Sequence, residues 1–83
     1  MEKPHIPNRV ATFVKMPLIE IVGQNRVLIE NHNGVLGYSL EEIQVKVNFG
    51  RVQIIGKNLR IMQLCKDQLV ITGSVEAVQL YGR

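Results

Sequence analysis

Residues 43–55 read Ile-Gln-Val-Lys-Val-Asn-Phe-Gly-Arg-Val-Gln-Ile-Ile and carry the clearest structural signal in the chain. From Ile43 to Val47 every second residue is apolar and the residues between are polar, which is the period of a β-strand with one buried and one solvated face. A turn at Phe49-Gly50 then predicts a hairpin that pairs Val47 with Val52. In that pairing the apolar face continues from one strand to the next.

Three stretches share a second pattern, in which an apolar strand is interrupted by a glycine and then resumes. The first two extend into a longer match, in which Glu20 aligns with Gln53 and Leu28 with Ile61. Glycine followed by Lys, Asn or Ser is typical of turns and bulges, so the pattern predicts a domain built from recurring hairpins. The stretches are Ile21-Val22-Gly23-Gln24-Asn25, Ile54-Ile55-Gly56-Lys57-Asn58 and Val70-Ile71-Thr72-Gly73-Ser74.

The first half of the chain predicts two further turns. A three-residue loop at Gly23-Gln24-Asn25, with Asn25 in the left-handed region, pairs Val22 with Arg26. This register places four apolar residues on one face of the hairpin and buries no charge. A type I′ turn at Asn33-Gly34 is predicted between strands that contain Ile29 and Val35. The four residues on the shared face are Ile19, Ile21, Val27 and Ile29.

The strand pattern indicates an all-β fold, because six or seven short strands follow one another with tight connections and no helical stretch long enough for a crossover. We expect an antiparallel meander that curls into a roll, a small sandwich or a barrel. Residues 17–83 form a single β-domain in this interpretation. Residues 1–16 form a short N-terminal arm, in which Asn8 to Met16 fits a short helix that ends at Pro17.

Length and composition limit how the domain is stabilised. The 83 residues are 46% hydrophobic and 20% charged, which is the composition of a globular domain and not of a disordered chain. A chain of this size buries only about 60–65% of its unfolded surface. Several strands, including Leu18–Val22, are apolar on both faces, so a second layer or a second subunit must cover them. We therefore expect a symmetric homodimer.

Cysteine content and the N-terminal residues favour a cytoplasmic protein. Cys65 is the sole cysteine and cannot close a disulfide within the chain, and its spacing to the two histidines is not that of a zinc site. Residues 1–7 are polar and contain two prolines, and no run of about 18 apolar residues follows. The sequence predicts neither export nor direct insertion into a membrane.

The net charge of +3 raises the question of a nucleic-acid partner. The ten basic residues are spread along the chain and no three are adjacent, whereas nucleic-acid binders concentrate basic groups on one face. Tyr38, Phe49 and Tyr81 are also few for base stacking. A small basic β-barrel that binds single-stranded nucleic acid is therefore kept as the alternative function, and nucleic acid is not the partner that the sequence favours.

The best candidate site is the polar run Glu30-Asn31-His32-Asn33-Gly34. It brings a carboxylate, an imidazole and amides together at a strand end, but the same composition is typical of a turn, and we favour the turn. There is no phosphate-binding glycine loop and no nucleophile elbow. We expect a protein that is not an enzyme, with no catalytic residues, cofactor or metal, and with Glu30, Asn31, His32 and Gly34 as a candidate interaction cluster.

Four groups of residues between Pro17 and Tyr81 form a recognisable set of motifs. They are Pro17 to Gly23, Ile29-Glu30-Asn31-His32-Asn33-Gly34-Val35-Leu36 with Tyr38-Ser39, Gly50 to Ile61, and Leu69 to Gly73 with Tyr81. On these motifs the strand-forming region resembles the YabP/YqfC type of small sporulation proteins from endospore-forming bacteria, and its first half is similar to the YqfC branch.

The resemblance implies a role that the residues alone do not contain. Members of this family are made in the mother cell during sporulation, and they are needed for or associated with forespore and coat development. The resemblance implies a location in the mother cell. Together with strands that need covering and the lack of a cofactor motif, it leads us to expect a cytoplasmic protein that acts by protein–protein interaction. The resemblance also implies a membrane-anchored sporulation protein of the YqfD type as a partner, which could hold the chain at the forespore membrane. No catalytic residues are carried over.

Overall fold

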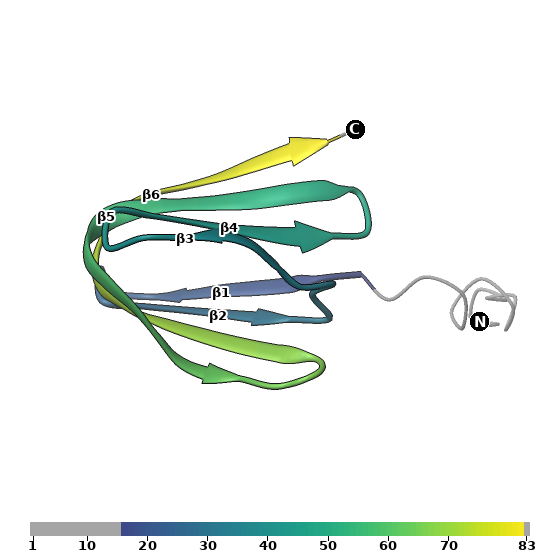
Figure 1. Cartoon of the computed structure of the whole chain (residues 1–83), viewed down its shortest axis with the longest axis horizontal. Helices are drawn as coiled ribbons and strands as arrows, with labels where there is room; N and C mark the ends of the chain where they lie inside the picture. Colours follow the sequence, from purple (N-terminus) through teal and green to yellow (C-terminus); the bar gives the residue numbers. More distant parts are fainter. Residues whose placement is uncertain (1–15, 83) are drawn as a thin grey trace, which may run out of the picture.

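A computed structural model describes residues 16–82, which form six β-strands in one antiparallel sheet and no helix (Figure 1). The all-β prediction is confirmed. The arm predicted for residues 1–16, with its helix, falls outside the described residues except for Met16. The strands are β1 (Leu18–Val22), β2 (Arg26–Glu30), β3 (Val35–Tyr38), β4 (Glu42–Val47), β5 (Gly50–Leu64) and β6 (Gln68–Gly82).

The strand order is β1-β2-β6-β5-β4-β3. Strands β3 to β6 form the expected meander, while the β1–β2 hairpin joins the sheet on the far side of β6 and so departs from a simple meander. Four strands are short, as predicted, but β5 and β6 have 15 residues each. The sheet ends at β1 and β3, and these two strands do not pair, so the sheet is an open roll and not a barrel.

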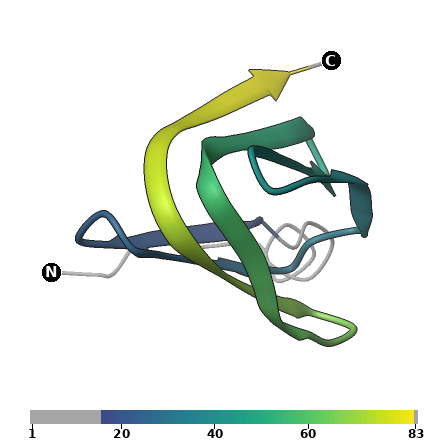
Figure 2. The same cartoon turned by 60° about the vertical axis from the view of Figure 1, so that its left-hand side comes forward.

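Strands β5 and β6 bend together and fold the sheet into two halves (Figures 1 and 2). In the first half, β1 and β2 lie beside residues 68–72 of β6, which pair with residues 60–64 of β5. In the second half, β3 and β4 lie beside residues 50–55 of β5, which pair with residues 77–82 of β6. Register shifts next to Gly56 and Lys57 mark the bend, because β-bulges increase local bending and twist.

The three glycine patterns of the sequence meet at this bend. Gly56 and Gly73 do not end strands; they allow the close approach of β5 and β6, because a Cβ on Gly56 would collide with the carbonyl oxygen of Ser74. The loop that contains Gly23 docks on the same place, with the N–H groups of Gly73 and Val75 donating to the β1–β2 loop at 3.2 and 2.7 Å. The predicted breaks in strands are therefore bulges within two continuous strands.

The core lies between the two halves and is aliphatic. Its residues come from every second position of β2, β4 and the two long strands, which is the alternation that the sequence predicts. Burying such side chains stabilises a fold by about 1.5–3 kcal/mol each relative to exposure. The buried residues are Val27, Ile29, Ile43, Val45, Val47, Val52, Ile54, Leu59, Leu69 and Ile71.

The predicted register of the first hairpin is confirmed. Val22 pairs with Arg26 across a three-residue loop, and Ile19 pairs with Ile29 on the core face. The left-handed residue of this loop is Gly23, with φ of 57°, and not Asn25. Glycine adopts this conformation without a Cβ penalty, so the turn uses it in preference to asparagine.

The predicted register of the β4–β5 hairpin is wrong by two residues. Val47 pairs with Gly50 and Val45 pairs with Val52, so the turn is the tight Asn48-Phe49 pair. A shift of two residues leaves every side chain on the same face, and the apolar pattern therefore cannot detect it. Gly50 takes the first paired position because a Cβ there would collide with the backbone of Tyr81.

Candidate functional site

The polar run Glu30–Gly34 connects the two halves of the sheet. Glu30 is the last residue of β2, and Val35 begins β3 in the other half. Strands β2 and β3 are not paired, so the predicted type I′ hairpin between Ile29 and Val35 is wrong. The left-handed non-glycine residue of the run is Asn31, with φ of 63°, which turns the chain away from β2.

His32 is buried, with 7% of its surface exposed, and both ring nitrogens bond to backbone groups. Its Nδ1 accepts the N–H of Gly34 at 2.9 Å, which places the ring proton on Nε2. Nε2–H then donates to the carbonyl oxygen of Cys65 at 3.0 Å. His32 therefore fastens its own connection to the end of β5, which lies 33 residues further along the chain.

The other residues of the run bond to three further segments. The N–H of Asn31 donates to the carbonyl of Asp67 at 2.6 Å, and its side-chain amide donates to the carbonyl of Met16 at 3.0 Å. Asn33 donates its N–H to the carbonyl of Lys46 at 2.7 Å, and Lys46 donates its N–H to the carbonyl of Gly34 at 2.8 Å. The run thus holds the start of β1, the β5–β6 loop and β4 in one place.

The contacts of this run link separate segments of the fold to one another. The run does not have the geometry of a reactive site. Glu30 pairs with Leu18 and Gln68 in the sheet, and it is not among the hydrogen-bond partners of His32. The two ring nitrogens of His32 are already engaged, so neither faces a ligand. Within residues 16–82 no group of three or more His, Cys, Asp or Glu side chains is placed to hold a metal ion.

Cys65 follows β5 and is exposed, with its sulfur 3.4 Å from the side-chain amide of Gln63. His5, the second histidine, lies outside the described residues. In the described part of the chain, residues 16–82, no helix is long and apolar enough to cross a membrane.

A polar network on the outer face of the second half was not anticipated from the sequence. Glu42 accepts hydrogen bonds from the side-chain amides of Gln44 (2.8 Å) and Gln53. The Tyr81 hydroxyl lies 3.0 Å from the side-chain oxygen of Gln53 and 2.5 Å from that of Gln79, and it can donate its one proton to either. The Arg51 guanidinium lies over the Tyr81 ring at 4.3 Å. The signal was present, because glutamines alternate with apolar residues in three strands, but cross-strand register is needed to see that they touch.

Comparison with known proteins agrees with the motifs. The model of the YabP family matches residues 15–83. The chain belongs to the YabP family. The uncharacterized protein YqfC of Bacillus subtilis (strain 168) is 31% identical over 67 residues, which are 81% of this chain and 72% of that protein. No solved structure matches this YabP-family chain. Membership in the family indicates a sporulation-related protein.

Proposed function

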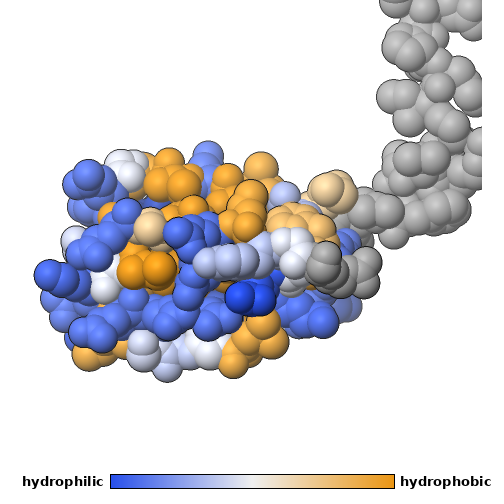
Figure 3. Space-filling view, turned by 90° about the horizontal axis from the view of Figure 1, so that it is seen from above, coloured by the Kyte–Doolittle hydropathy of each residue, from blue (hydrophilic) through white to orange (hydrophobic). Residues whose placement is uncertain are grey.

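We propose that this YabP-family protein is not an enzyme and acts by protein–protein interaction in the mother cell during forespore and coat development. The observation that carries the proposal is an unpaired strand edge in a chain of this family. Within residues 16–82, ten large hydrophobic side chains, including Leu36 and Leu80, are more than half exposed. Figure 3 shows one face of the molecule, on which hydrophobic side chains lie exposed among hydrophilic ones. Exposed apolar side chains mark a site of protein contact where they gather in one patch, so the unpaired edge is what decides which of them do.

Besides the outer edges of β1 and β3, the end of β6 is an unpaired edge, and it is the edge that the proposal uses. Strand β2 pairs with β6 only at residues 68–72, so on that side residues 76–82 have no neighbouring strand within the described chain. Leu80 is 59% exposed although its cross-strand neighbour Val52 is fully buried on the same sheet face. The edge carries one charge, Glu76. A long edge with so little charge readily accepts another strand.

A second copy of the chain fits this edge. If two β6 strands pair antiparallel about a two-fold axis at Gln79, Val78 of one copy faces Leu80 of the other. Both side chains lie on the core-facing side of the sheet, so the pairing covers Leu80 and continues the sheet across two subunits. The proposed homodimer uses this edge.

We expect Leu80→Lys to convert a dimer of the 9.4 kDa chain into a monomer, because a desolvated ammonium group would face the apolar side of the joined sheet. Sedimentation equilibrium measures the change, and circular dichroism checks that the fold remains. Leu36→Lys is the matched control, since Leu36 is 58% exposed but lies on the β3 edge. A monomeric wild-type protein, or dissociation by Leu36→Lys alone, would contradict the proposed interface.

The cellular part of the proposal is tested by imaging a fluorescent fusion in the source organism as it enters sporulation. We expect signal only in the mother cell, gathered at the membrane around the forespore, where the proposed YqfD-type partner would hold the protein. A pull-down from the same cells then tests for that membrane-anchored protein. Diffuse signal in vegetative cells, or signal over the nucleoid, would contradict the proposal.

A further inference from the structure

Arg26 of β2 and two basic residues of β5, Lys57 and Arg60, come together at the bend. Arg26 pairs with Thr72, and Thr72 pairs with Arg60. Arg26, Thr72 and Arg60 therefore form one row across β2, β6 and β5. Directly paired residues of antiparallel strands point to the same face. Their neighbours Val27 and Ile71 face the core, and the row therefore lies on the outer face.

Lys57 extends this row around the bend, where it pairs with Ser74. Arg26, Lys57 and Arg60 are all exposed. Arg26 and Arg60 are separated by two strand spacings, about 9.6 Å of backbone, which lets two long side chains reach the same small anion. We call Arg26, Lys57, Arg60, Thr72 and Ser74 the bend cluster.

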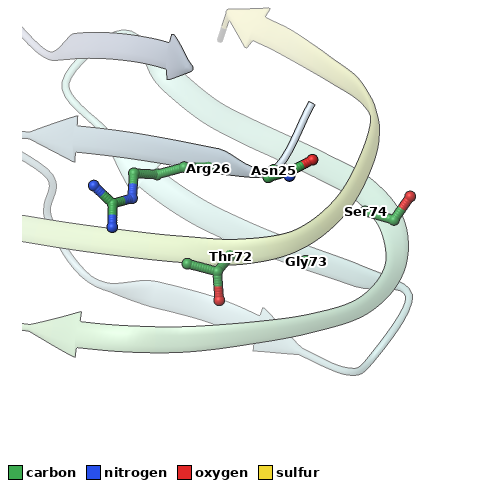
Figure 4. Close-up of a pocket in the computed structure, with 5 residues that line it drawn as sticks. All are labelled: Asn25, Arg26, Thr72, Gly73 and Ser74. Atoms are coloured by element: carbon green, nitrogen blue, oxygen red, sulfur yellow. The ribbon is translucent and has the colours of Figure 1, made fainter. Parts of the chain in front are cut away.

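A shallow depression of about 540 Å³ lies at the bend cluster and is lined by Asn25, Arg26, Thr72, Gly73 and Ser74 (Figure 4). The Arg26 and Thr72 side chains extend from neighbouring strands, and Asn25 and Ser74 lie further toward the bend. Gly73 has no side chain because a Cβ there would collide with the backbone of Asn58 and Leu59. The guanidinium of Arg26, the hydroxyls of Thr72 and Ser74 and the amide of Asn25 border the depression and can donate hydrogen bonds, whereas Lys57 and Arg60 do not line it.

The cations of the bend cluster have no acidic partner in the described part of the chain. No ion pair joins Arg26, Lys57 or Arg60 to another side chain of residues 16–82. The nearest carboxylates along the strands are Glu20, which pairs with Leu28 in the next row, and the exposed Glu76. Arg26 and Arg60 lie on either side of β6 as like charges, and a bound anion would relieve the repulsion between them.

We propose that the bend cluster binds a phosphate group, carried either by a lipid headgroup or by a soluble phosphate ester. Arginine binds phosphate through two parallel N–H donors, and threonine and serine hydroxyls complete its hydrogen bonding. The site does not favour nucleic acid, because Phe49 and Tyr81 lie at the far end of the other half and offer no stacking surface beside Arg26. The proposal does not depend on the homodimer.

Two titrations of the intact chain test the proposal and distinguish the sources of phosphate. In the first, potassium phosphate replaces chloride at constant ionic strength, and amide chemical shifts are followed by NMR. In the second, the protein is sedimented with vesicles of equal parts phosphatidylglycerol and phosphatidylcholine, and with vesicles of phosphatidylcholine alone. We expect shifts at Asn25, Thr72 and Ser74 for soluble phosphate, or binding to the anionic vesicles alone for a lipid headgroup.

The double variant Arg26→Gln/Arg60→Gln should weaken whichever binding is seen by at least about tenfold, since it removes two of the three cations that attract the anion. Both residues are exposed, so the fold should persist, and circular dichroism checks it. Lys66→Gln is the matched control, because Lys66 lies in the β5–β6 loop at the other end of these strands. Absence of binding in both titrations, or equal losses in the double variant and in Lys66→Gln, overturns the assignment. Binding to a single-stranded oligonucleotide without binding to either phosphate probe also overturns it.

Discussion

Replacing His32 with alanine is expected to lower the free energy of unfolding by about 2–4 kcal/mol, which is a large part of the stability of a domain of this size. The imidazole is buried and accepts one hydrogen bond while donating another, both with backbone groups. Its removal leaves the N–H of Gly34 and the carbonyl of Cys65 without these partners and opens a cavity between the two halves. Urea denaturation followed by circular dichroism measures the loss.

Two further variants separate this crosslink from an ordinary turn, where alanine would cost at most about 1 kcal/mol. His32→Asn keeps an acceptor for the Gly34 N–H but is too short to reach Cys65, so we expect about half of the loss. Asn33→Ala removes only an exposed bond to Asn48 and should change stability by about 0.5 kcal/mol or less. Similar small losses for all three variants would show that His32 is an ordinary turn residue.

The sequence was sufficient to predict the strands and one hairpin because those features depend on local patterns. Alternation from Ile43 to Val47 identifies a half-buried strand, and the burial of Ile43, Val45 and Val47 confirms it. The Val22–Arg26 pairing was predictable because a shift of one residue would have buried Glu20. In both cases a wrong assignment would bury a charged side chain in the core, and a few neighbouring residues are enough to show this.

The long-range arrangement could not be predicted in the same way. A shift of two residues in the β4–β5 hairpin changes no face, so the hydrophobic pattern carries no information about it. The Asn33-Gly34 pair has the composition of a hairpin turn, yet β2 pairs with β6 and not with β3. Pairings between distant strands depend on the packing of the whole sheet, which no short window of sequence contains.

The candidate site shows the same division between local and distant information. Composition indicated a connection at Glu30–Gly34, and a connection is what the structure contains. The burial of His32 was not foreseen, because its partner Cys65 lies 33 residues away. Likewise Arg26 is distant from Lys57 and Arg60 in the sequence, and only the register through Thr72 of β6 brings it beside them.

The bend itself depends on Gly56, and we expect Gly56→Ala to destabilise the protein by about 3 kcal/mol or more. A Cβ at this position would collide with the carbonyl oxygen of Ser74 and approach the side chain of Leu59. The carbonyl oxygen of Ser74 is part of the backbone of β6, and backbone cannot move aside as a flexible side chain could. The collision must therefore push β5 and β6 apart where they carry the sheet from one half to the other.

Gly37→Ala provides the matched control for this prediction, because it makes the same change in another strand of the same sheet. No atom lies within 4 Å of the Cβ that the substitution would add at Gly37. Alanine there should be neutral or slightly stabilising, since it reduces the conformational freedom of the unfolded chain. Urea denaturation of the two variants beside the wild-type protein measures the difference. Equal stability of the two variants would mean that the bend tolerates a side chain and that the approach of β6 to Gly56 does not determine the fold.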